Sequence, residues 1–256
     1  MLEVRSLSKS YAALRALQDV NLQVCEGQIV GLIGPNGSGK STLFDIVSGF
    51  QQGDAGSIVF RGSSLRGASP NSIARRGLVR TFQHSEGGHR MTALENLLAA
   101  AGDQIEANLF AALLRLPQLL KVENANLERA REVLALLGLT HVENEYVGNL
   151  SGGQRKLIDL GRVLMARPAL CLLDEPTAGV NPSLINVIVD ALITMRRDEG
   201  ITLLIVEHNM RAVTELCERV YVLAAGRVIA EGTPAEIQSD EQVITSYLGR
   251  SRPVHA

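Results

Sequence analysis

The sequence predicts an α/β protein with a mainly parallel core sheet, an N-terminal antiparallel β subdomain and an inserted helical lobe. Three observations support this prediction. Apolar and polar positions alternate at the start of the chain, helical periodicity dominates its middle, and apolar runs alternate with helical patterns after that.

The N-terminal part of the chain combines two kinds of strand. Apolar and polar positions alternate over residues 2–25, as they do in half-buried antiparallel strands. Residues 28–33 are more continuously apolar, which indicates a strand covered on both faces. After a Gly-rich loop, a helix is expected because four apolar residues recur at helical spacing: Leu43, Ile46, Val47 and Phe50.

Helical patterns dominate residues 84–165, which we expect to form the inserted lobe. One of them opens with Thr92 and Glu95, which have the spacing of a capping box. A later one stops at Gly138, as helices often stop at glycine.

Three strand-like runs follow the lobe, at residues 169–173, 201–206 and 219–223. Helical patterns at residues 184–195 and 210–217 separate them, which is the alternation of a parallel α/β sheet. The last run continues into a pattern that resembles a closing hairpin.

We expect one domain over residues 1–256. Its core comprises residues 1–83 and 166–249, residues 84–165 form the helical lobe, and residues 250–256 form a tail.

The composition is that of an ordinary globular protein, with 46% hydrophobic and 20% charged residues. The net charge of -2 gives no basic field, so we expect no nucleic-acid partner. The most apolar stretch, residues 109–120, is interrupted by Arg115 and Pro117, whereas a membrane-spanning helix needs ~20 apolar residues. We therefore expect no membrane span. We also expect no signal peptide, and we expect the cysteines to be reduced and structural, as in a cytosolic protein.

The strongest local signal lies between the strand at residues 28–33 and the helix that follows it. The pattern G-x-x-x-x-G-K-[ST] is matched, with one more hydroxyl residue after it, by Gly34, Pro35, Asn36, Gly37, Ser38, Gly39, Lys40, Ser41 and Thr42. Glycines let backbone N–H groups turn toward phosphates, and the helix N-terminus attracts the same charge. We therefore predict a phosphate-binding loop for ATP, in which Lys40 reaches the β- and γ-phosphates and Ser41 ligates Mg²⁺.

Two adjacent carboxylates, Asp174 and Glu175, follow the apolar run at residues 169–173. Parallel sheets bind ligands at this carboxyl edge, so Asp174 suits Mg²⁺ and Glu175 suits activation of the attacking water. Taken alone, the pair is as well explained by capping of the next loop. The phosphate-binding loop upstream favours the catalytic interpretation.

The segment Ser151, Gly152, Gly153 and Gln154 has two interpretations. Ser151 and Gln154 have capping-box spacing ahead of a helix, which is a purely structural role. Two bare glycines behind a hydroxyl at a helix N-terminus also form a second anion-binding construction.

Together these three motifs resemble the ATPase domain of ABC transporters, over nearly the whole chain, and Leu150–Gln154 resembles that family's signature sequence. The resemblance implies a P-loop NTPase fold of ABC type that hydrolyses Mg·ATP. It also implies that two subunits enclose two ATP molecules, so that residues 151–154 contact the ATP of a partner subunit.

Further positions are carried over from the family by resemblance. Tyr11 matches the aromatic residue that stacks on adenine, although a lone Tyr more often packs in a core. Gln83 matches the glutamine that contacts Mg²⁺, and His208 matches the histidine that contacts the γ-phosphate, although such a histidine is usually a surface residue. Asn181 lies in the loop that contacts the partner's ATP, where the family usually has Asp.

Several segments resemble the bacterial branched-chain amino-acid uptake ATPases, among them residues 178–182, 206–210 and 231–249. The resemblance implies a second ATPase subunit, membrane permease subunits, a periplasmic binding protein and a place at the cytoplasmic face of the bacterial inner membrane. Urea uptake and lipopolysaccharide export remain alternatives, as does a soluble ABC ATPase without a membrane partner. Residues 84–90 lack the bulky apolar residues of this branch, which indicates either a diverged partner or a tolerant loop.

Overall fold

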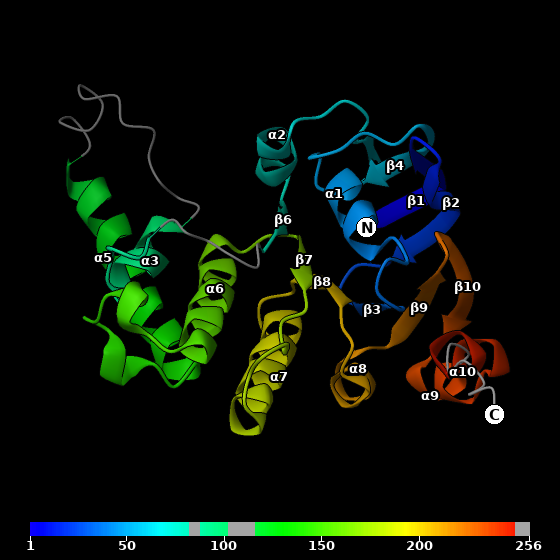
Figure 1. Cartoon of the computed structure of the whole chain (residues 1–256). Helices are drawn as coiled ribbons and strands as arrows, with labels where there is room; N and C mark the ends of the chain where they lie inside the picture. The colour runs from blue at the N-terminus through cyan, green and yellow to red at the C-terminus, as the bar shows by residue number, and fades with distance from the viewer. Residues whose placement is uncertain (82–87, 102–115, 249–256) are drawn as a thin grey trace. The chain divides into compact units, whose positions relative to one another are not determined.

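The computed structural model describes residues 1–81, 88–101 and 116–248 (Figure 1). The chain divides into two compact units. The core unit comprises Met1–Phe82, Ala169–Ala178 and Leu192–Ala256, and the helical unit comprises Gln83–Pro168 and Gly179–Ala191. Residues 179–191 therefore group with the helical unit, whereas the division made from sequence placed them in the core.

One sheet of the core unit is antiparallel, with the strand order β2-β1-β4-β5. Its strands are β1 (Leu2–Tyr11), β2 (Leu14–Val24), β4 (Ala55–Phe60) and β5 (Ser63–Ser64). The pairing of β1 with β2 confirms the antiparallel N-terminal strands that the alternation predicts.

The second sheet of the core unit has the order β10-β9-β3-β8-β7-β6. Its strands are β3 (Ile29–Ile33), β6 (Leu78–Arg80), β7 (Leu170–Asp174), β8 (Thr202–Val206), β9 (Arg219–Ala224) and β10 (Arg227–Gly232). All neighbours pair in parallel except β9 and β10, which form the expected hairpin. Every residue of β3 and of β8 is buried, as strands covered on both faces require.

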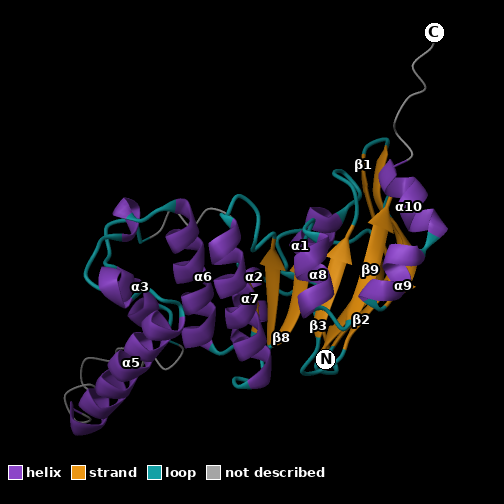
Figure 2. Cartoon of the chain, turned by 90° about the horizontal axis from the view of Figure 1, so that it is seen from below, coloured by secondary structure: helices purple, strands orange, loops and turns teal. Residues whose placement is uncertain are grey.

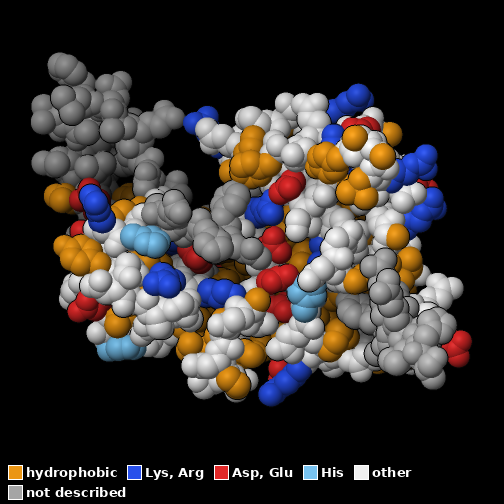
Figure 3. All heavy atoms as spheres, viewed as in Figure 1, with side chains coloured by type: hydrophobic (Ala, Val, Ile, Leu, Met, Phe, Trp, Pro, Cys, Tyr) orange, Lys and Arg blue, Asp and Glu red, His pale blue; other side chains and the backbone are white. Residues whose placement is uncertain are grey.

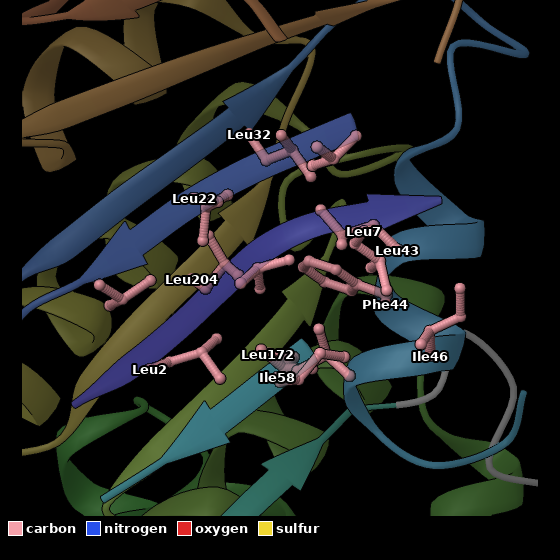
Figure 4. Packing of buried hydrophobic residues seen from close by; sticks show 14 of the residues in the cluster. Leu2, Leu7, Leu22, Leu32, Leu43, Phe44, Ile46, Ile58, Leu172 and Leu204 are labelled. Carbon is pink, nitrogen blue, oxygen red and sulfur yellow. The ribbon is translucent and has the colours of Figure 1, made fainter. Parts of the chain in front are cut away.

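Helix α1 (Lys40–Val47) contributes its apolar face to a core shared by both sheets. Leu43 and Phe44 point toward Leu7 of β1 and Leu172 of β7 (Figure 4). Phe50, which the helical spacing placed on the same face, instead lies beyond the end of the helix with 52% of its surface exposed. Because α1 ends at Val47, the chain has already turned away from the core at this position.

Further short helices belong to the core unit: α2 (Pro70–Arg75), α8 (Met210–Leu216), α9 (Pro234–Ser239) and α10 (Glu241–Leu248). Figure 2 shows α8 and α9 in front of the strands of the six-stranded sheet, and Figure 1 places α1 on the opposite side of β3 from α8.

The three cysteines are free thiols, and burial raises the pKa of Cys217 to about 12.

The helical unit contains α3 (Ala93–Ala99), α5 (Leu116–Leu136), α6 (Gly152–Ala166), the first turns of α7 (Pro182–Arg197) and two 3₁₀ turns, Thr140–Val142 and Val147–Asn149. The predicted capping box of Thr92 and Glu95 is present, and α5 ends just before Gly138, whose φ is 67°. A Cβ at Gly161 would lie 2.7 Å from Leu97 of α3, so glycine lets α6 approach α3 closely. Within the described ranges, no helix is both long and apolar enough to span a bilayer.

Candidate functional site

The glycine loop of the core unit joins β3 to α1. Gly34, Gly37 and Gly39 have φ values of 153°, 77° and 110°, which residues with a side chain rarely adopt. A Cβ at Gly34 would clash with the carbonyl oxygen of Leu223, and one at Gly39 would lie 2.5 Å from the carbonyl oxygen of Ala16. Packing as well as conformation therefore requires glycine at these two positions.

Two polar side chains in this loop fit a phosphate ligand. Lys40 is only 6% exposed, and its Nζ donates to the carbonyl oxygens of Gly34 at 2.7 Å and Pro35 at 3.0 Å. Burial lowers the pKa of the Lys40 ammonium, against the opposing attraction of Glu175 and Asp174. The Ser38 hydroxyl is buried and has no hydrogen-bond partner among the described residues, so a polar ligand would satisfy it.

Asp174 is the last residue of β7 and lies beside Arg80 at the end of β6. Arg80 bridges two carboxylates, with Nη1 2.5 Å from Asp45 Oδ1 and Nη2 3.5 Å from Asp174 Oδ2. Burial raises the pKa of Asp174, and the Arg80 guanidinium opposes this shift. Arg80 therefore links Asp45 of α1, the helix after the glycine loop, to Asp174, a carboxylate suited to Mg²⁺.

Replacing Arg80 by Met should lower the free energy of unfolding by about 2 kcal/mol, because it leaves two carboxylates without their shared cation. The loss should be largest above the pKa of Asp174 and should shrink as the pH falls through it, since a neutral carboxyl needs no cation. Denaturant unfolding of the metal-free protein over a series of pH values from 8 downward measures both effects. An equal loss at every pH at which the native protein stays folded would contradict this role of Arg80.

Glu175 and His208 approach each other at the carboxyl edge of the six-stranded sheet. His208 Nε2 lies 2.7 Å from Glu175 Oε1, and because an ionised carboxylate only accepts, the imidazole donates this bond. Glu175 itself has a φ of 50°, an uncommon value for a residue with a side chain, and its N–H donates to the Val206 carbonyl at 2.9 Å. The pair offers a base and a neighbouring hydrogen-bond donor.

A groove of about 560 Å³ in the core unit brings several of these groups together. Its lining combines Tyr11, most of the glycine loop including Lys40 and Ser41, and the carboxylates Asp174 and Glu175. Acidic and basic side chains gather over β7 and β8 on the face seen in Figure 3. The groove is large enough for a nucleotide, with an aromatic side chain and phosphate ligands on one continuous surface.

The remaining described candidates lie in the helical unit. Ser151 Oγ accepts from the Gln154 N–H, and Gln154 Oε1 accepts from the Ser151 N–H, so the predicted capping box is formed. A Cβ at Gly152 would meet nothing within 4 Å, whereas one at Gly153 would clash with Leu184 of α7. A Cβ at Gly153 would therefore require the end of the Leu184 side chain to move, whereas one at Gly152 would displace nothing.

Asn181 has a local role that the sequence did not indicate. Its Oδ1 accepts from the Leu184 N–H at 2.9 Å and from the Ser183 hydroxyl at 2.8 Å, at the start of α7. Gln83 lies outside the described residues, as do residues 84–87 and 109–115.

The model of the ABC transporter family matches residues 17–178, which is more than half of the chain. The chain belongs to this family and is an ABC-type ATPase. A second model, for the branched-chain amino acid ATP-binding cassette transporter, matches residues 227–252.

The relatives found include high-affinity branched-chain amino acid transport ATP-binding proteins. LivG of Escherichia coli K12 is 36% identical over 98% of both chains, and BraF of Pseudomonas aeruginosa is 37% identical over 98% of both. A probable LivG of Archaeoglobus fulgidus is 39% identical over 97% of this chain and 95% of its own.

Solved structures agree with the fold described above. A nucleotide-free ATP-binding cassette from an ABC transporter has a TM-score of 0.81 at 34% identity, over 96% of this chain and 98% of that chain. The ADP conformation of such a cassette gives 0.81 at 33% identity, over 98% of this chain and 99% of that chain. The ABC-type nucleotide-binding fold is thereby confirmed.

Arg80, Thr177 and Glu207 contact the candidate residues but were not singled out from sequence. Arg80 is the last residue of the short strand β6, which has no clear pattern of its own. Glu207 carried a usable signal, because it is an acidic residue directly after the wholly apolar end of β8.

Proposed function

We propose that this chain is the ATP-binding and hydrolysing subunit of an ABC importer for branched-chain amino acids. The observation that most supports it is the groove in which the glycine loop, Asp174 and Glu175 share one surface. The cargo class is supported by the LivG and BraF relatives and by the C-terminal family model. Neither urea uptake nor lipopolysaccharide export is named among these relatives.

In this proposal ATP occupies the groove of the core unit. The adenine stacks on Tyr11, a residue that is 40% exposed, and the phosphates lie along the loop from Gly34 to Thr42. The backbone N–H groups of that loop, the Ser38 hydroxyl and Lys40 bind the phosphate oxygens.

Mg²⁺ would be held by Ser41 and Asp174, with Gln83 as a further ligand, and when bound it neutralises charge on the phosphates. Glu175 orients and deprotonates the attacking water. His208 turns its Nε2 donor from Glu175 to the γ-phosphate in the closed state, and its bond to Glu175 in the structure holds it beside that position until then.

The working unit is a pair of ATPase subunits, either two copies of this chain or this chain and a sister subunit. Each γ-phosphate is then bound by Lys40 of one subunit and by Ser151, Gly152, Gly153 and Gln154 of the other, with Asn181 nearby. A dimeric ATP-binding cassette solved with ADP and Pi is 25% identical to this chain, with a TM-score of 0.75 over 91% of this chain and 99% of its own. The pair drives permease subunits from the cytoplasmic face of the membrane, and a periplasmic binding protein delivers the amino acid to these permease subunits. No nucleic acid is involved.

Purification of the complex from its native host, followed by reconstitution into vesicles, tests this function. We expect ATP-dependent uptake of labelled leucine, isoleucine or valine, supported by two permease subunits and a binding protein. Lys40→Ala is the control, because it removes the phosphate ligand and should abolish nucleotide binding and uptake. Uptake of urea but no amino acid, or purification without any membrane subunit, would contradict the proposed cargo or the transport role.

A further inference from the structure

Glu207 is a buried acidic side chain beside the proposed catalytic pair. It directly follows β8, precedes His208 and is only 3% exposed. Within the described part of the chain, no Lys or Arg side chain forms an ion pair with it. A buried charge without a partner costs several kcal/mol unless hydrogen bonds satisfy it.

Four hydrogen bonds satisfy this carboxylate, two at each oxygen. Oε1 accepts from the N–H of Thr177 at 2.8 Å and from its hydroxyl at 2.7 Å. Oε2 accepts from the N–H groups of His208 at 3.0 Å and Asn209 at 3.2 Å. Since an ionised carboxylate has about four acceptor positions, the donors of two separate loops use all of them.

These bonds join the loop after β7 to the loop after β8. Thr177 follows Glu175 closely in the first loop, and His208 lies in the second. Two further contacts join these segments. The Glu175 N–H donates to the carbonyl of Val206, the last residue of β8, and His208 Nε2 lies 2.7 Å from Glu175 Oε1. Glu207 is thus the buried residue whose hydrogen bonds fix the backbone on both sides of the contact between His208 and Glu175.

We infer that Glu207 is a positioning residue for ATP hydrolysis. By hydrogen bonding both to Thr177 and to the backbone of His208, it holds His208 in place relative to Glu175. The inference rests on the proposed function, because it assigns a role only if Glu175 and His208 act on ATP. Glu207 itself faces backbone N–H groups and a hydroxyl, so it acts through its neighbours and not on the nucleotide.

Glu207→Gln is the sharpest variant, because it keeps the shape but removes half of the acceptor capacity. The amide has one acceptor oxygen, and its NH₂ group would face N–H donors. We expect kcat for ATP hydrolysis to fall roughly 10- to 100-fold, as a displaced catalytic group does, while KM for ATP changes less than about 3-fold. Glu215→Gln, on the exposed surface of α8, is the matched control and should keep native kcat.

A merely structural role would lower the melting temperature but would not depend on His208. The same Glu207→Gln change is therefore made in a His208→Ala background, with single-turnover hydrolysis of radiolabelled ATP to measure slow rates. If Glu207 acts through His208, the change should cost less than about 3-fold there. An equal loss in both backgrounds, or native kcat in the single variant, would overturn the inference while leaving the proposed function intact.

Thr177 supplies a milder pair of variants that does not remove a buried charge. Thr177→Val deletes the 2.7 Å hydroxyl bond and should lower kcat several-fold, roughly in line with the loss of about 1 kcal/mol per hydrogen bond. Thr177→Ser keeps the hydroxyl and should restore native kcat. Equal activity of the two variants would also overturn the inference, whereas no hydrolysis by the native chain or its complex would contradict the proposed function itself.

Discussion

Replacing Glu175 by Gln should reduce ATP turnover roughly 100- to 10,000-fold while ATP still binds. The amide cannot take a proton from water, but it preserves the size of the side chain and leaves Lys40 and the glycine loop unchanged. Because γ-phosphate is no longer lost, the ATP-bound dimer should accumulate. Phosphate release measures turnover, and gel filtration with Mg·ATP measures the dimer, either of this chain or with its sister subunit.

Lys40→Ala separates the effect on ATP binding from the effect on ATP turnover. It should bind little ATP and should form no dimer, because the phosphate loses the ammonium that the loop carbonyls hold in place. Turnover at the native rate with Gln at position 175 would remove Glu175 from the proposed mechanism. A monomeric Glu175→Gln variant that binds ATP tightly would instead contradict the phosphate-bridged dimer.

The parts of the site that sequence reasoning predicted are those formed by local patterns. The capping box of Ser151 and Gln154 spans four residues, and the glycine loop is continuous between a strand and its helix. The position of Asp174 at a strand end follows from the apolar run before it. In each case the physical cause lies within a few residues, so a pattern along the chain is sufficient to find it.

The parts that were missed depend on partners far apart in sequence. Arg80 meets Asp174 across two strands, and Glu207 meets Thr177 across two loops. No spacing rule predicts such pairs, since the parallel order β8-β7-β6 brings them together. Strands β4 and β5 were missed for another reason, because Gly56 and several serines hide the alternation of a half-buried strand.

Phe50 shows how a periodic pattern can continue past its element. It fits the apolar spacing of α1, but the helix ends at Val47, and Gly49 turns the chain with a φ of 80°. The preference of glycine for that turn outweighs the burial of one more aromatic residue. A large apolar side chain is left exposed as a result.

Replacing Gly152 by Asp should abolish ATP-driven dimer formation and lower turnover at least about 100-fold, with no loss of stability. In the isolated chain the change is harmless, because a Cβ at Gly152 meets nothing within 4 Å and an acidic residue in the first turn of α6 favours the helix by about 0.5 kcal/mol. In the proposed dimer the same carboxylate would face the γ-phosphate of the partner's ATP, and two like charges would meet where an anion site is required. Thermal unfolding, gel filtration with Mg·ATP and phosphate release measure the three quantities.

Position 152 gives a cleaner test than position 153, where a side chain would also clash with Leu184 inside the subunit. Ala235→Asp is the matched control, since it adds the same charge to the first turn of α9, on an exposed position outside the proposed dimer site. Gly152→Ala separates charge from size, and it should retain more of the native turnover than Gly152→Asp. If Gly152→Asp hydrolysed ATP at the native rate, the helix N-terminus at Ser151 would be a structural cap alone, and the second phosphate site of the proposed mechanism would have to lie elsewhere.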